Sequence, residues 1–381
     1  MKRINSILFT LIFVLLCSCS QQSDKYNVEN KYKINLEKES TPSIYDLFSK
    51  VEIVPLETKD SALLDFPSGE SEKVVVHNGT FWFLYKNKIL VFDSYGMYLK
   101  QLNKQGRGPG EYYTIEDFCV SPSEELEILC SSGHYIMKYD ANSLEMKKKI
   151  DLPREIPPVS HFEIINSESY ILVSKANEYK MFCYNVQTNV ITELDYSLPK
   201  WMNRNTTLVS SKNPFHRCGD SLCFTQSYNG HVWTISSDGK KLVPRYFWDF
   251  GDYNLTLKDI PQYNSVRDYI AKTQNMSYNH AMLFLTHQEN EHYYFTRFKF
   301  KNRYKYLIID KINRKHLLFD SFKEGGQCLP QAIDDKYVYS FLPAYIVHKI
   351  IDFQTIDEKS RQIIEKLDKE SNPIIVKYHL K

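Results

Sequence analysis

Glycine is scarce in this sequence, with 13 glycines among 381 residues, yet three of them stand within five positions of the stretch KQGRGPGEYY at 104–113. A phosphate-binding loop would require a Lys-Ser or Lys-Thr pair after the glycines and a helix that begins there. Glu111 follows the glycines instead, and the segments on both sides are predicted strands. A phosphate cradle is therefore excluded, and the glycines indicate a connection between strands.

Short motifs of common catalytic and metal sites are also missing. No HExxH, GxSxG or CxxC motif occurs, which excludes the usual zinc-protease helix, the nucleophile elbow of α/β-hydrolases and a zinc ribbon. The eleven histidines are scattered, and His287 and His292 bracket QENE at a spacing that suits no common metal site. We therefore predict no metal and no cofactor, and we identify no catalytic residue.

Neither sign of charge is in excess. Lysine and arginine together number 48, aspartate and glutamate number 46, and two of the basic residues lie in an N-terminal segment that we expect to be removed. Binding to a phosphate backbone requires a surplus of basic residues. The composition therefore argues against a nucleic-acid partner.

Cysteine is too sparse for a disulfide framework. Eight cysteines occur, and the six that follow Cys19 are spread over the remaining chain, unlike the dense spacing of small disulfide-stabilised domains. Cys218 and Cys223 flank the sequence GDSL and could lie opposite each other across a tight hairpin. A single bridge between these two cysteines is left open.

The N-terminus has the features of an export signal. Two basic residues precede Ile7 to Leu16, a run that is apolar except for one threonine and is too short to span a bilayer. The run ends in LCSC, which resembles the lipobox of bacterial lipoproteins, with Ser18 before the cysteine that receives the lipid. We predict a signal peptide at 1–18 and lipidation of Cys19; an ordinary secretory signal is the alternative. No second long apolar run follows, so we expect attachment to the membrane through the lipid.

The remaining chain contains a repeat. Residues 19–40 are polar and lack periodicity, so we expect a flexible tether there and one folded body over 41–381. Within the body, short strands separated by turns recur roughly every 45 to 50 residues, with one longer interval, in copies that start at Phe81, Leu126, Tyr170, Leu222, Tyr293 and Tyr337. This period predicts an all-β fold, a six-bladed β-propeller. A pair of β-sandwiches is the alternative, but it does not predict the regular repeat.

Short helical segments and a closing strand complete the predicted body. Helices are expected at 264–275 and at 355–370, where Thr355 and Glu358 would form a capping box. The final IIVKYHL is a predicted strand. We expect it to share a blade with VEIVPLET at 51–58 or the strands after it, because pairing the two ends of the chain removes an exposed sheet edge.

Several motifs of the chain resemble one family of proteins. The order VFDSYG, an outer strand and GRGPGEY, together with IVPLET, DDKYVYSF and ESNPIIVKYHLK, is similar to six-bladed β-propeller lipoproteins of Gram-negative gut bacteria. Looser forms of GRGPGEY occur in NHL-type propellers. The resemblance covers essentially the whole chain after the signal. It implies the propeller fold and a location in the cell envelope, at the outer membrane, on its periplasmic or surface face.

The glycine-rich loop admits two interpretations. In the first, its glycines permit positive φ, Arg107 and Glu111 pair across the turn, and the loop holds the first blade against the second. In the second, the loop lies at the mouth of the central channel, and Arg107, Glu111 and Tyr112 line a ligand site. The structural interpretation is favoured.

Two functions from different classes remain. The first is a membrane-anchored, monomeric lipoprotein that binds a peptide, protein or glycan, or acts as a scaffold, without catalysis. The second is a propeller enzyme of the lyase or lactonase (hydrolase) type with a polar or metal site at the central channel. Three or more histidine or carboxylate side chains that meet at the channel mouth would favour the enzyme. No such set is visible in the sequence, so binding is favoured.

Overall fold

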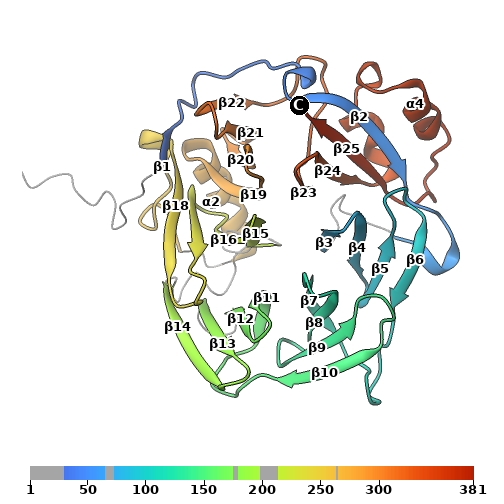
Figure 1. Cartoon of the computed structure of the whole chain (residues 1–381). Helices are drawn as coiled ribbons and strands as arrows, with labels where there is room; N and C mark the ends of the chain where they lie inside the picture. The colour runs from blue at the N-terminus through green and yellow to red at the C-terminus, as the bar shows by residue number, and fades with distance from the viewer. Residues whose placement is uncertain (1–29, 65–72, 175–178, 198–212, 263–264) are drawn as a thin grey trace, which may run out of the picture.

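Six β-sheets stand in a ring in the computed structural model, which describes residues 30–64, 73–174, 179–197, 213–262 and 265–381 (Figure 1). The predicted six-bladed, all-β propeller is confirmed. Each of the six copies found in the sequence begins at the second strand of a blade or immediately beside it. The first strand of each blade lies nearest the centre of the ring, and the outermost strand forms the rim (Figure 1).

Blades 1 to 3 each consist of four consecutive antiparallel strands. Blade 1 contains β3 (Lys73–His77), β4 (Thr80–Tyr85), β5 (Lys88–Phe92) and β6 (Tyr98–Leu102). Blade 2 contains β7 (Ile115–Val120), β8 (Glu125–Cys130), β9 (Tyr135–Asp140) and β10 (Met146–Asp151). Blade 3 contains β11 (Val159–Asn166), β12 (Ser169–Ser174), β13 (Lys180–Asn185) and β14 (Val190–Ser197).

Blades 4 and 6 each include one strand from the N-terminal part of the chain, and blade 5 consists of four consecutive strands. Blade 4 contains β15 (Phe215–Cys218), β16 (Ser221–Thr225), β17 (His231–Ile235), β18 (Leu242–Asp249) and the added β1 (Asn30–Lys33). Blade 5 contains β19 (Met282–Glu289), β20 (Tyr293–Phe300), β21 (Arg303–Asp310) and β22 (Lys315–Phe319). Blade 6 contains β23 (Ala332–Ile333), β24 (Tyr337–Leu342), β25 (Ile374–Leu380) and β2 (Phe48–Pro55).

The two ends of the body close the ring in blade 6. Strand β25 lies between β24 and β2, and its pairing with β2 sets Val54 opposite Ile375 and Glu52 opposite Lys377. The predicted closure by VEIVPLET and IIVKYHL is therefore confirmed. The physical reason is that β25, which buries Ile374, Ile375, Val376 and Tyr378, would otherwise be an open edge of the sheet.

The predicted tether is wrong from residue 30 onward. Strand β1 pairs in parallel with β18, and Ile34 and Leu36 are buried in the core between blades 4 and 5. Tyr32, Ile34 and Leu36 alternate with polar residues, which is a strand period that the polar composition of this segment obscures. Residues 19–29 of the predicted tether, with Cys19, lie outside the described residues.

Both predicted helices exist with different boundaries. Helix α2 (Val266–Asn279) extends beyond the predicted 264–275, and α4 (Glu358–Glu365) is shorter than the predicted 355–370. The predicted capping box is wrong, because the carboxylate of Asp357 accepts the N–H of Ser360 and caps α4 instead. A carboxylate at this position also interacts favourably with the helix dipole. Thr355 ends the preceding turn η6 (Phe353–Thr355).

The hydrophobic core is divided among the interfaces between blades. Six apolar clusters are present, one at each interface between neighbouring blades. Both faces of a central strand therefore pack against apolar neighbours, as in β12, where all six residues are buried. Central strands of this kind are continuous apolar runs rather than alternating ones.

The short helices lie outside the sheets. The helix α3 (Val347–Ile350) and the single turns η1 (Ile44–Asp46), η2 (Asp60–Ala62), η4 (Gly251–Tyr253) and η5 (Ala344–Ile346) belong to the connections. Helix α4 packs on β2, where the hydroxyl of Ser360 accepts the N–H of Ile53 at 3.3 Å. Within the described part of the chain, no helix has the length and apolar character needed to cross a bilayer.

Candidate functional site

Tyr112 is the anchor of the glycine-rich loop between β6 and β7. Its side chain is fully buried in the core between blades 1 and 2. Its hydroxyl donates to the carbonyl of Asn87 at 2.8 Å and accepts the N–H of Lys104 at 3.2 Å. Burial raises the pKa of Tyr112 to about 12. Tyr112 therefore stabilises the blade interface. The second interpretation of the loop, in which Tyr112 lines a ligand site, is wrong for this residue.

Glu111 folds back on the loop rather than pairing with arginine. Its Oε2 accepts the N–H of Gly108 at 2.7 Å, and no ion pair joins it to Arg107, although the structure describes both residues. A Cβ on Gly106 would lie 2.0 Å from this oxygen, and one on Gly108 would lie 3.1 Å from it. Of the three loop glycines only Gly110 has positive φ, at +75°. The predicted pairing of Arg107 and Glu111 is therefore absent, and two of the glycines leave space for a carboxylate.

A groove of about 520 Å³ lies beside the loop. The loop supplies one wall, which includes Arg107, Pro109, Glu111 and Tyr113. Arg107 and Glu111 are exposed, and Tyr113 retains 58% of its accessible surface. A volume of this size falls in the range of small-molecule sites, which is roughly 300 to 1,000 Å³.

The opposite wall of the groove is one face of blade 2. Tyr135 and Met137 come from β9, and Met146 and Lys149 come from β10. These are the two outer strands of the blade, so the groove lies toward the rim and not at the inner strand β7. The expected position at the channel mouth is not observed, because Tyr112 fixes the loop before the chain turns inward.

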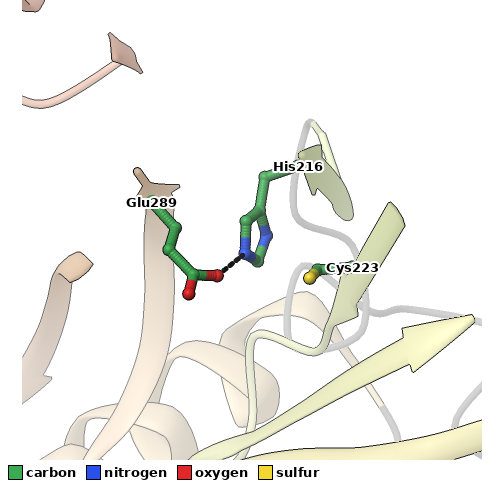
Figure 2. Close-up of side chains that lie close together, drawn as sticks. All are labelled: His216, Cys223 and Glu289. Carbon is green, nitrogen blue, oxygen red and sulfur yellow. Dashed lines mark hydrogen bonds and ion pairs between the residues drawn. The ribbon is translucent and has the colours of Figure 1, made fainter. Parts of the chain in front are cut away.

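A second group of polar side chains is buried between blades 4 and 5. Figure 2 shows His216 of β15, Cys223 of β16 and Glu289 of β19, whose ligating atoms all lie within 4.8 Å of one another. This group, which we call the Glu289 cluster, is not among the residues predicted from the sequence. His216 and Glu289 are 73 residues apart and meet only because the inner strands of the two blades are neighbours.

Glu289 already has a full set of hydrogen-bond donors. Its carboxylate accepts from Arg245 Nη2 at 2.9 Å, Lys311 Nζ at 2.8 Å and the hydroxyl of Tyr246 at 2.7 Å, and His216 Nε2 lies 3.4 Å away. Burial alone would raise the pKa of this carboxyl, but His216 and Arg245 hold it well below its usual range. A metal ion would have to compete with two cations for the same oxygens, so the cluster fits a metal poorly.

The histidines beside Glu289 differ in their electrostatic environments. Burial lowers the pKa of His216, but Cys223 and Glu289 outweigh burial and raise it to about 9. His287 stacks on His216 with ring centroids 6.2 Å apart, and burial lowers its pKa well below the usual value. The side chains of His216 and Glu289 are at most 3% exposed and Cys223 is fully buried, so a substrate cannot reach them in this conformation.

Buried ion pairs also join other blades. Lys73 of blade 1 donates to Asp117 of blade 2 at 2.8 Å, and the second oxygen of Asp117 accepts the N–H of Phe162 in blade 3. Lys73 and Asp117 have side chains no more than 5% exposed. The Glu289 cluster is therefore one of several polar contacts that hold neighbouring blades together, and it has no geometry specific to catalysis.

The possible bridge between Cys218 and Cys223 is absent. Cys218 pairs with Ser221 across the β15–β16 hairpin, whereas Cys223 lies opposite His216. The two-residue turn sets this register, which separates the two cysteines along the hairpin. All six described cysteines are free.

These observations define the chain as a six-bladed β-propeller closed by strands from both ends of its body, with an open groove at the rim between blades 1 and 2. The chain belongs to the family described as domain of unknown function DUF4934, whose model matches residues 28–379. A comparison with curated proteins finds no match.

One solved structure supports the fold. The chain is similar to a Bacteroides fragilis protein described as a "Putative exported protein", with a TM-score of 0.70, 16% identity, and coverage of 92% of this chain and 99% of that one. Weaker similarities include BamB from Moraxella catarrhalis (TM-score 0.40, 9% identity, 76% and 72% covered) and the Neurospora crassa Pan2 WD40 domain (TM-score 0.41, 8% identity, 90% and 98% covered). At 16% identity, the similarity to the Bacteroides fragilis protein concerns the fold alone.

Proposed function

We propose that this protein is an exported, lipid-anchored propeller of the cell envelope that acts as a monomer and binds a peptide, protein or glycan without catalysis. The apolar run before Ser18 and Cys19 supports export and lipidation. The similarity to a propeller described as exported agrees with this location. Because β1 begins at Asn30, only ten residues separate Cys19 from the folded body, which would hold the body close to the membrane.

The observation that carries the binding function is the groove. Tyr113 and Arg107 project from a loop whose backbone is fixed by Tyr112 and by the bond between Glu111 and Gly108. A backbone that is already rigid removes the cost of ordering the loop when a ligand binds. The only described group of three histidine, cysteine and acidic side chains with metal-ligand spacing is buried and occupied by internal contacts, so binding is favoured over catalysis.

Lipidation is tested by expressing the full chain in a Gram-negative host with a labelled fatty acid. The wild type and the matched control Cys17→Ala should incorporate label and sediment with membranes, because Cys17 lacks a small residue before it. Cys19→Ala should do neither. Unlabelled wild-type protein, or labelled Cys19→Ala, would contradict the proposed anchor.

Binding is tested with the mature chain in detergent on arrays of immobilised glycans and peptides. The wild type should bind a restricted set of ligands, and Tyr113→Ala should lose that binding without a change in melting temperature. Lys148→Ala is the matched control, because Lys148 is exposed on β10 but does not line the groove. The proposal fails if no ligand is bound, or if Tyr113→Ala and Lys148→Ala bind like the wild type.

A further inference from the structure

The groove contains two cationic groups that a ligand can reach. No ion pair involves Arg107 among the described residues, so its planar guanidinium is available to bind a carboxylate through two hydrogen bonds. Lys149 Nζ lies 2.7 Å from Asp151, but the two side chains are 45% and 75% exposed. Exposed ion pairs of this kind contribute little to the stability of the fold. A ligand carboxylate can therefore replace Asp151 as the partner of Lys149.

The groove also presents flat apolar surfaces. Tyr113 is 58% and Met146 40% exposed, although both are large hydrophobic residues. The ring of Tyr135 is held by a bond from Ser131 to its hydroxyl, and Lys149 Nζ lies 4.4 Å from its centroid. Aromatic rings of this kind offer an apolar face and a polar tip. A sugar ring matches them, with a flat face of C–H groups and hydroxyls along its edge.

Glu111 adds an acceptor that limits the charge of the ligand. Its Oε2 is used by Gly108, and no described residue donates to its Oε1. A sugar hydroxyl can donate to this free oxygen. The same carboxylate repels a ligand of high negative charge density, such as a phosphate-rich one. The groove therefore suits a hydroxylated unit that carries one negative group.

A peptide backbone fits the groove less well. The loop uses its own backbone groups, since the N–H of Gly106 donates to the carbonyl of Tyr112 and the N–H of Glu111 donates to the carbonyl of Gly108. The opposite wall is one face of blade 2, because Lys149 and Met137 are cross-strand partners on the same side of the sheet. Strand β10 is also the outer edge of this sheet, but a peptide added there would continue the sheet and would not lie on the face that forms the groove. Recognition inside the groove therefore comes from side chains, which favours a glycan.

We infer that the groove binds a uronic-acid residue of an acidic glycan, with the carboxylate held by Arg107 and Lys149 and the sugar ring stacked on Tyr113. This inference rests on the proposed binding function and adds the class of ligand to it.

The test is calorimetric titration of the mature chain with trisaccharides of galacturonate and of glucuronate. The controls are the neutral trisaccharides of the same linkage and a glutamate tripeptide. We expect a uronic-acid trisaccharide to bind and its neutral counterpart to bind at least about tenfold more weakly, as the loss of a charged hydrogen bond implies. Arg107→Ala should weaken binding about 10- to 100-fold. Arg107→Lys should lose less, and Lys148→Ala nothing.

The outcomes separate the inference from the function on which it rests. Equal binding of neutral and acidic trisaccharides, or unchanged binding by Arg107→Ala, would overturn the inference. Tighter binding of the glutamate tripeptide would also overturn it and would leave a peptide-binding groove. Failure of every uronic-acid trisaccharide overturns it as well, and the arrays with Tyr113→Ala then decide whether the binding function survives. Equal melting temperatures of Arg107→Ala and wild type exclude misfolding as a cause.

Discussion

Replacing Glu289 by glutamine should destabilise the interface between blades 4 and 5 strongly. The substitution keeps the shape of the side chain but removes the charge that Arg245 and Lys311 share. Breaking a buried ion pair costs about 3–5 kcal/mol. Arg245 and Lys311 retain 20% and 13% of their side-chain exposure. We therefore expect a loss in the free energy of unfolding near the lower limit, about 3 kcal/mol.

The expected shift in melting temperature follows from the size of the body. Residues 28–379 comprise 352 residues (379 − 28 + 1). At about 2.1 cal/mol/K per residue, the entropy of unfolding is about 0.74 kcal/mol/K, so 3 kcal/mol corresponds to about 4 °C. Differential scanning fluorimetry of the mature chain measures this shift. Glu291→Gln is the matched control, because Glu291 is exposed two residues away, and it should change the melting temperature by less than about 1 °C.

The effect of Glu289→Gln should also depend on pH. The folded-state pKa of Glu289 is lowered, so its contribution to the free energy of unfolding is complete above the unfolded pKa of about 4.3. That contribution is lost as the pH falls from about 4.3 toward the folded-state pKa. The folded-state pKa of His216 is raised to about 9, so its contribution to the free energy of unfolding is complete below the unfolded pKa of about 6.5. That contribution is lost as the pH rises through about 9. The difference between variant and wild type should therefore be largest between about pH 5 and 6.5. A melting temperature within 1 °C of wild type in that window would refute the assigned role of Glu289.

Three further predictions concern the loop, the closing strand and the cysteines. Tyr112→Phe should lower the melting temperature by about 1–4 °C, since it leaves buried backbone groups without a partner, whereas Arg107→Ala should leave it unchanged; equal effects would show that Arg107 also stabilises the blade interface. Deletion of residues 372–381 removes the strand between β2 and β24 and should abolish the cooperative thermal transition, so a truncated chain that melts like wild type would disprove closure by β25. Alkylation of the denatured, unreduced mature protein should modify all six cysteines that follow Cys19, and a count of four would indicate a bridge between Cys218 and Cys223.

The division of the loop into two roles could not be predicted from its sequence. Tyr112 and Tyr113 are adjacent and chemically identical, yet the first is fully buried and the second is 58% exposed. Alternation along an extended chain places neighbours on opposite sides. Which of the two faces the core depends on where blade 1 packs against blade 2.

The architecture of this protein could be predicted from its amino-acid sequence. Strand composition, turns and a repeat of 45 to 50 residues imply sheets that cannot bury both faces alone, and six such sheets satisfy one another only in a closed ring. The closing strands could be found in the same way, because an unpaired edge at either end would be costly. These properties follow from local patterns, so no knowledge of distant contacts was needed.

The side chains that meet in space, by contrast, could not be predicted without the folded structure. The Glu289 cluster joins strands of different blades, and Cys218 is kept from Cys223 by a two-residue turn that sets the hairpin register. The groove forms from a loop and the face of another hairpin, and the tether segment becomes a strand only because β18 offers a free edge at the rim. Each of these contacts depends on how whole sheets are placed beside one another, and the spacing of residues along the chain does not encode that placement.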